Sequence, residues 1–143
     1  MPRLKEQITV SRDQDEAFAY TADFANIEQW DPGVARSSRT SGGPLGVGSS
    51  FDLLVKFGSR TLPMTYRITE YEPSSRVVLE GVGDKIQAVD EITFASTDVG
   101  TAITYIADLN FGGVMRWVAP LLRPMLDRVG KKAVAGLAAA LDS

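Results

Sequence analysis

The stretch from Val34 to Phe111 constrains the fold most, because nearly all of it alternates between apolar and polar residues. Such alternation is typical of strands whose two faces meet different surroundings. The predicted strands cover residues 34–41, 51–57, 61–69, 76–82, 88–94 and 103–111. Short turns separate them, as is usual for antiparallel neighbours, so the sequence predicts an antiparallel meander. Its first strand is polar and is expected at a sheet edge.

The chain before this meander predicts one more strand and two short helices. Residues 3–10 alternate in the same way and form the expected first strand. Ser11 is the expected N-cap of the following helix, in a capping box with Gln14. Asp23 is the expected cap of a second short helix that ends at Gln29.

The segment from Asp23 to Pro32 places two large rings, Phe24 and Trp30, in a short polar stretch. Pro32 disfavours helical geometry in the residue before it and so ends the helix. A segment this short cannot bury two aromatic rings by itself. We therefore expect a concave surface elsewhere in the fold to receive them.

Composition excludes several classes of function. The chain has no Cys and no His, which removes disulfides, thiol nucleophiles, Ser-His-Asp catalysis and the common zinc sites. The net charge of −3 argues against nucleic acid as a partner. No apolar run approaches the length of a membrane span, and the N-terminal residues lack a signal core. We expect a cytoplasmic protein with no stable membrane insertion, no metal site and no cofactor.

The C-terminal stretch has apolar residues at helical spacing from Val114 to Leu141. A helix of about 28 residues would be about 42 Å long. Pro120 is expected to kink this helix or to mark a late start. A helix is about 10–12 Å wide, which is too narrow to fill the concave face of a strongly twisted sheet of this size. The remaining gap must hold side chains or a ligand.

Four motifs occur in an order and spacing that resemble a known superfamily. They are the Asp-Phe-Ala-Asn and Trp-Asp-Pro of residues 23–32, residues 63–73, residues 100–105, and Pro120 in the apolar terminal helix. The chain resembles the START-related helix-grip superfamily (SRPBCC), which includes polyketide cyclase/dehydrase-like and lipid-transfer proteins. The resemblance implies an α+β helix-grip fold: a seven-stranded curved antiparallel sheet wrapped around a long C-terminal helix, with two short helices after the first strand. It covers nearly the whole chain, and we expect one domain over residues 1–143.

The apolar faces of the predicted strands are the expected lining of an internal cavity, together with rings and side chains near its mouth. Taken one at a time, each is also explained by ordinary core packing. Trp30 is equally explained as a gate and as a plug at the end of the core. The candidate cavity residues are Trp30, Phe51, Leu53, Val55, Phe57, Met64, Tyr66, Ile68, Asp90, Ile92, Phe94, Tyr105, Met115, Trp117 and Leu121.

Asp90, Tyr66 and Tyr105 share strand faces with these apolar residues. A carboxylate inside an apolar cavity has a raised pKa and is suited to act as a general base. The favoured alternative is structural: Asp90 pairs with Arg67 or Arg76, and the tyrosine hydroxyls bind cavity water. The sequence therefore does not assign the catalytic residues.

Three functions are compatible with these features. The first is binding or carrying of a hydrophobic small molecule, lipid or polyketide-like, in the cavity. The second is a cyclase/dehydrase-type enzyme in which Asp90 takes a carbon-bound proton and Tyr66 or Tyr105 stabilises the oxyanion. The third is an interaction module that uses the sheet edge or the basic C-terminal helix. The sequence leaves open the ligand, the oligomeric state and whether the protein is an enzyme.

Overall fold

The computed structural model describes residues 3–113, 121 and 123–142, and a seven-stranded antiparallel sheet is its largest element. The strands are β1 (Arg3–Val10), β2 (Val34–Arg39), β3 (Ser50–Phe57), β4 (Arg60–Glu72), β5 (Arg76–Gly83), β6 (Ile86–Thr97) and β7 (Gly100–Phe111). Their order across the sheet is β1-β7-β6-β5-β4-β3-β2. The predicted meander is confirmed, and so is the edge position of the polar strand β2.

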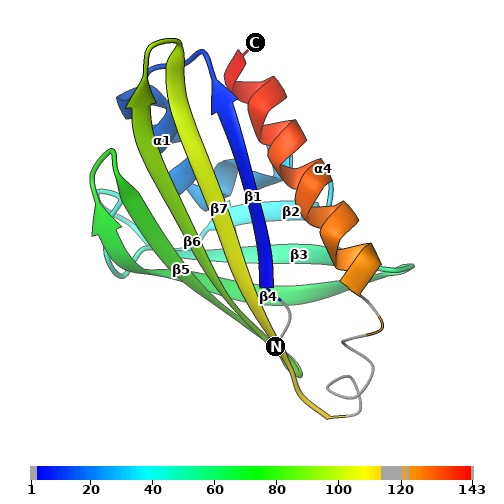
Figure 1. Ribbon diagram of the computed structural model, residues 1–143. Helices are drawn as coiled ribbons and strands as arrows, with labels where there is room; N and C mark the ends of the chain where they lie inside the picture. Colours follow the sequence, from blue (N-terminus) through cyan, green and yellow to red (C-terminus); the bar gives the residue numbers. More distant parts are fainter. Residues whose placement is uncertain (1–2, 114–120, 122, 143) are drawn as a thin grey trace.

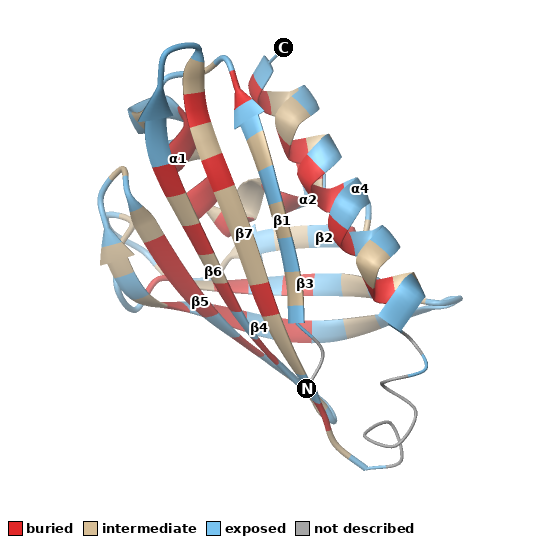
Figure 2. Ribbon diagram, viewed as in Figure 1, coloured by how far each residue is buried: buried red, intermediate tan, exposed pale blue. Residues whose placement is uncertain are grey.

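The sheet is strongly curved, as Figure 1 shows: β2, β3 and β4 run almost across the direction of β1 and β7. Buried and exposed residues alternate along most strands, which gives the sheet one covered and one open face (Figure 2). This is the period-two pattern that the sequence displays.

The β6–β7 hairpin depends on Gly100. Its φ is +150°, and a Cβ there would lie 1.9 Å from the carbonyl oxygen of Val10. Only glycine permits this approach, and it lets β7 pair with β1 along the whole of β1.

The helix α1 (Gln14–Ala22) starts later than predicted, and Ser11 is not its N-cap. Asp13 is the cap, with a side-chain oxygen that accepts a hydrogen bond of 2.8 Å from the backbone N–H of Glu16. Ser11 instead donates from its backbone N–H and its hydroxyl to Asp142, at 2.7 and 2.8 Å. The capping-box prediction was wrong because the partner of Ser11 lies at the other end of the chain.

The second predicted helix is a short 3₁₀ turn, η1 (Phe24–Asn26), followed by one α-helical turn, α2 (Ile27–Trp30). Asp23 caps η1 by accepting a 3.0 Å hydrogen bond from the backbone N–H of Ala25. Phe24 is fully buried and packs against Phe51 on the sheet, with ring centroids 6.2 Å apart. The rings of this segment are thus received by the concave face of the sheet, as predicted.

The C-terminal helix α4 (Arg123–Asp142) has 20 residues and is about 30 Å long, and most of the predicted stretch before it lies outside the described residues. Pro120 lies outside the described residues. Figure 1 shows α4 running beside β1, and it packs on both β1 and α2. The contact with α2 is close at Gly136, where a Cβ would lie 1.8 Å from the carbonyl oxygen of Trp30.

The packed core occupies one end of the concave face, between the sheet, the short helices and the C-terminal half of α4. Its members are largely apolar and almost fully buried. They include Phe18, Phe24, Phe51, Ile68, Leu79, Ile92, Phe94, Ile103 and Leu137. Among the described residues, α4 covers the other end of the concave face, and the candidate site lies there.

Candidate functional site

A cavity of about 180 Å³ lies between α4 and the concave face of the sheet. Strands β1, β3, β4, β6 and β7 and the N-terminal half of α4 all contribute to its wall. Most of the wall is apolar. The residues around it are Leu4, Glu6, Asp31, Val55, Lys56, Phe57, Gly58, Met64, Tyr66, Ile86, Ala88, Asp90, Tyr105, Ala107, Leu109, Phe111, Met125, Leu126, Val129, Gly130, Ala133 and Val134.

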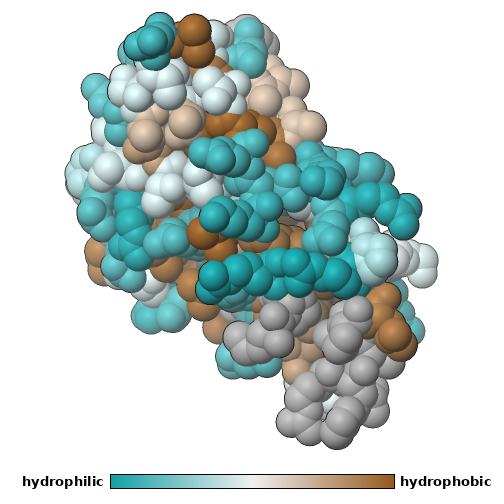
Figure 3. Space-filling view, viewed as in Figure 1, coloured by the Kyte–Doolittle hydropathy of each residue, from teal (hydrophilic) through white to brown (hydrophobic). Residues whose placement is uncertain are grey.

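Small residues on facing walls explain why this space is open. Ala88 and Ala107 are buried on neighbouring strands of the sheet, and Gly130 and Ala133 face the cavity from α4. None of these side chains reaches far from its backbone, so α4, which packs on β1, leaves a space over β6 and β7 unfilled. Hydrophilic side chains cover most of the face seen in Figure 3, and hydrophobic ones appear between them near its centre.

The polar end of the cavity centres on Asp90 of β6 and Tyr105 of β7. Asp90 lies opposite Ala107, and Tyr105 lies opposite Ile92, so the two side chains are diagonal neighbours on one face of the sheet. The Tyr105 hydroxyl donates a hydrogen bond to Oδ2 of Asp90. Asp90 is only 4% exposed.

Burial raises the pKa of Asp90 to about 7, while the hydrogen bond from Tyr105 acts in the opposite direction and the charge of Asp31 raises it further. Burial also raises the pKa of Tyr105, and the negative charge of Asp90 adds to this. The pair therefore combines a carboxyl group that titrates near neutral pH with a phenol that stays protonated.

Tyr66 faces the same cavity from β4, opposite Gly81 of β5. A Cβ on Gly81 would lie 2.5 Å from the Tyr66 ring, so the ring occupies the space that a side chain would need. Burial raises the pKa of Tyr66 well above its ordinary value, and Asp90 raises it further. Its phenol is therefore protonated at neutral pH.

The sequence analysis missed Asp31, a second carboxylate of the cavity wall. Asp31 follows α2, and its Oδ1 accepts a 2.8 Å hydrogen bond from the backbone N–H of Gly33. Burial raises its pKa, and this hydrogen bond acts in the opposite direction. The position of Asp31 directly after Trp30 could have indicated that its carboxylate lies near the cavity. We interpreted the Asp-Pro pair only as the end of a helix.

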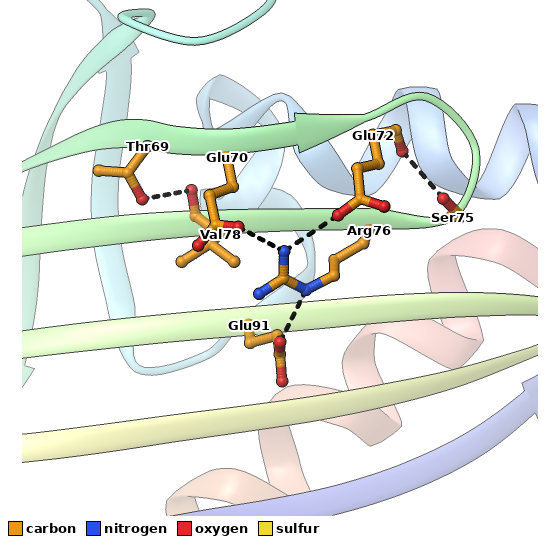
Figure 4. A network of polar contacts seen from close by, with 7 residues as sticks. All are labelled: Thr69, Glu70, Glu72, Ser75, Arg76, Val78 and Glu91. Atoms are coloured by element: carbon orange, nitrogen blue, oxygen red, sulfur yellow. Dashed lines mark hydrogen bonds and ion pairs between the residues drawn. The ribbon is translucent and has the colours of Figure 1, made fainter.

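The expected ion pair of Asp90 with Arg67 or Arg76 was wrong. Arg76 lies on the other face of the sheet and binds Glu70, Glu72 and Glu91, at 2.7, 3.0 and 2.7 Å (Figure 4). Arg67 is exposed. Residues separated by an odd number of positions along one strand point to opposite faces, which keeps Arg67 away from the cavity that Tyr66 lines. The Tyr105 hydroxyl, for which cavity water was the expected partner, donates its hydrogen bond to Asp90.

Six of the predicted cavity residues lie around the cavity: Val55, Phe57, Met64, Tyr66, Asp90 and Tyr105. Six others lie in the packed core instead: Trp30, Phe51, Leu53, Ile68, Ile92 and Phe94. The five strand residues among them share a face with the first group, but α1, η1 and α2, which includes Trp30, cover their end of the sheet. Leu121 is 79% exposed and lies away from the wall, and Met115 and Trp117 lie outside the described residues.

Trp30 lies in the packed core, as the interpretation of a plug predicts. It is 2% exposed, and its ring stands edge-on to Tyr105 with centroids 6.2 Å apart. Its indole N–H has no hydrogen-bond partner among the described residues. Trp30 therefore separates the polar end of the cavity from the packed core behind it.

The remaining wall residues were missed for two reasons. Ala88, Ala107, Leu109 and Phe111 share faces with predicted cavity residues, so strand alternation alone could have identified them. Leu4 and Glu6 of β1 follow the same alternation and could have been identified in the same way. The residues of α4 carried no such signal, because helical spacing does not say which part of a long helix crosses a cavity.

The described part of the chain has neither a cluster of metal ligands nor a membrane-spanning helix. No group of three or more His, Cys, Asp or Glu side chains there is arranged to hold a metal ion. No helix in that part has the length and hydropathy needed to cross a bilayer.

A family model matches nearly the whole chain. The model of the family described as "Polyketide cyclase / dehydrase and lipid transport" matches residues 1–142. No curated protein sequence matches the chain.

Solved structures with the same fold are distant in sequence. The protein TTHA0849 from Thermus thermophilus has a TM-score of 0.83 at 10% identity, covering 98% of this chain and 97% of its own. The Zhui aromatase/cyclase from Streptomyces sp. R1128 has a TM-score of 0.70 at 15% identity, covering 98% and 90%. A START superfamily protein from Mycobacterium smegmatis has a TM-score of 0.71 at 14% identity, covering 98% and 94%. With the family match over nearly every residue, the predicted helix-grip fold is confirmed, and the chain belongs to the polyketide cyclase/dehydrase and lipid transport family.

Proposed function

We propose that the protein binds a small hydrophobic molecule in the cavity between α4 and the sheet. The observation that carries this proposal is an apolar space of about 180 Å³ with one polar end, at Asp90 and Tyr105. Ligand sites are typically apolar pockets with a few polar groups that orient the guest. Membership of a family described by polyketide cyclisation and lipid transport supports the same class of ligand.

The volume of the cavity limits the size of the guest. An engineered apolar cavity of about 150 Å³ in another protein binds benzene, whereas ordinary ligand sites measure about 300–1,000 Å³. At about 180 Å³, this cavity suits a guest of roughly one ring or a short chain. A larger polyketide or lipid requires α4 to move away from the sheet.

Titration calorimetry with benzyl alcohol tests the proposal. Ala107→Leu fills the cavity from its sheet wall and should weaken binding by roughly tenfold or more, because the added atoms occupy the space of the guest. Ala102→Leu makes the same change on the opposite face of β7 and should leave binding unchanged. Absence of binding to the unmodified protein, together with native mass spectra free of any co-purified small molecule, would contradict the proposal.

The second candidate is an enzyme of the cyclase/dehydrase type, favoured by the pKa of Asp90 of about 7. A carboxylate with such a pKa is suited to remove a proton bound to carbon, and the proton would then reside on Asp90. The phenol of Tyr66 or Tyr105 would donate a hydrogen bond to the enolate oxygen that forms. The enolate carbon would attack a second carbonyl of the same molecule, and Asp90 would return its proton to the alkoxide to give an alcohol. Asp90 would then remove a second carbon-bound proton and deliver it to the hydroxyl, which would leave as water.

Turnover of a small β-keto polyketide mimic tests this candidate. Asp90→Asn keeps the shape of the side chain but removes the base, so the rate should fall by about 100-fold or more. Turnover that is equal in the two proteins would exclude Asp90 as the base. Binding without turnover would leave the carrier function as the better proposal.

A further inference from the structure

The charged side chains around the cavity are mostly negative. Titratable side chains reach it from β1, β3, β4, β6, β7 and the residue after α2. They are Glu6, Asp31, Lys56, Tyr66, Asp90 and Tyr105. The wall contributed by α4 carries no charged residue, since it consists of Met, Leu, Val, Gly and Ala.

Two cations among the described residues lie near the cavity. Lys56 lies on the wall at an exposed position, and Lys131 of α4 binds Glu6 at 3.5 Å. Among the described residues, neither Asp31 nor Asp90 forms a salt bridge. The charge of Asp31 also acts on Asp90, because it raises the pKa of the Asp90 carboxyl group.

On the basis of the proposed function, we propose that the polar end of the cavity, at Asp31 and Asp90, rejects ligands with a carboxylate head group. The same end binds ligands whose head group is an amine or a hydroxyl. A carboxylate head would bring a further negative charge next to Asp31 and Asp90, in a site from which water is largely excluded. An ammonium or hydroxyl head instead donates hydrogen bonds to the Asp90 carboxylate. A free fatty acid is therefore a poor guest, although its chain is apolar.

Three ring compounds of similar size separate the head groups: benzyl alcohol, benzylamine and benzoate. At pH 8, where Asp90 is largely ionised, benzoate should bind roughly tenfold or more weakly than the alcohol and the amine. In Asp90→Asn the difference between benzoate and benzyl alcohol should shrink several-fold. Asp52→Asn removes an exposed carboxylate from the outer face of β3 and is the matched control, for which no change is expected.

Lower pH provides a second measurement that needs no variant. At pH 6 a proton neutralises most of Asp90, so the unmodified protein should discriminate less against benzoate than at pH 8. Benzoate binding as tightly as benzyl alcohol at pH 8 would overturn the inference and leave the proposed function intact. A difference unchanged in Asp90→Asn would also overturn it. If none of the three compounds binds, the proposed function itself fails.

Discussion

The hydroxyl of Tyr105 donates a hydrogen bond to the carboxylate of Asp90 across the β6–β7 hairpin, inside the cavity. This contact joins the only two polar side chains of the hairpin's described residues that line the cavity wall. It satisfies one oxygen of a carboxyl group that is 4% exposed and has no cation beside it among the described residues. The stability and the binding properties of the protein should therefore both depend on pH.

Asp90→Asn should become more stable relative to the unmodified protein as pH rises. The unfolded chain loses the Asp90 proton near its ordinary pKa of 3.8, whereas the folded protein keeps it up to about 7. Between these values the folded state binds more protons, so this group's contribution to stability falls with rising pH. From pH 5 to pH 8 the difference between variant and unmodified protein should shift by about 2 to 4 kcal/mol in favour of the variant. Urea unfolding at both pH values measures it, and parallel profiles would contradict the prediction.

Tyr105→Phe should raise the pKa of Asp90 further, because the hydrogen bond from Tyr105 holds it down. Titration of the Asp90 carboxyl carbon by NMR measures the shift. Loss of the bond should also cost about 1–2 kcal/mol of unfolding free energy at pH 8. Tyr20→Phe is the control, since its hydroxyl binds Gln29 on the surface. A titration midpoint that stays where it was would show that the hydrogen bond does not act on Asp90.

Gly81→Ala should displace the Tyr66 ring, because the new Cβ would lie 2.5 Å from it. Overpacking of this kind costs about 1–3 kcal/mol. The displaced ring should also narrow the cavity and weaken binding of benzyl alcohol. Gly42→Ala is the control, since no atom lies within 4 Å of a Cβ there. Thermal unfolding and calorimetry of both variants check the prediction, and equal stability of the two would refute it.

Gly136→Ala and Gly130→Ala should have opposite effects, although both glycines lie in α4. At Gly136 the Cβ would lie 1.8 Å from the Trp30 carbonyl oxygen, so α4 must shift and stability should fall by roughly 2 kcal/mol or more. At Gly130 the nearest atoms are 3.6 Å away, and alanine should stabilise the helix by about 0.5–1 kcal/mol. Urea unfolding of both proteins measures the pair. A loss of stability in both would mean that the contact with Trp30 is not the cause.

Local pattern was sufficient for the strands and for the side of the sheet on which each residue lies. Phe51, Ile68 and Ile92 were predicted to face inward because strand alternation is a property of neighbouring residues, and they are fully buried. The helix cap was mispredicted for the opposite reason. Ser11 binds Asp142, and no local rule anticipates a partner 131 positions away.

The sequence by itself determined an antiparallel curved sheet, a terminal helix too narrow to cover it, and an inward face that carries Asp90, Tyr66 and Tyr105. Only the tertiary structure decided which part of that face stays open. The short helices fill one end of the face. At the other end, Gly130 and Ala133 of α4 and Ala88 and Ala107 of the sheet line the open space. Whether a space remains depends on which small side chains face each other across two elements far apart in the chain. That pairing is set by packing, which no periodicity along the sequence contains.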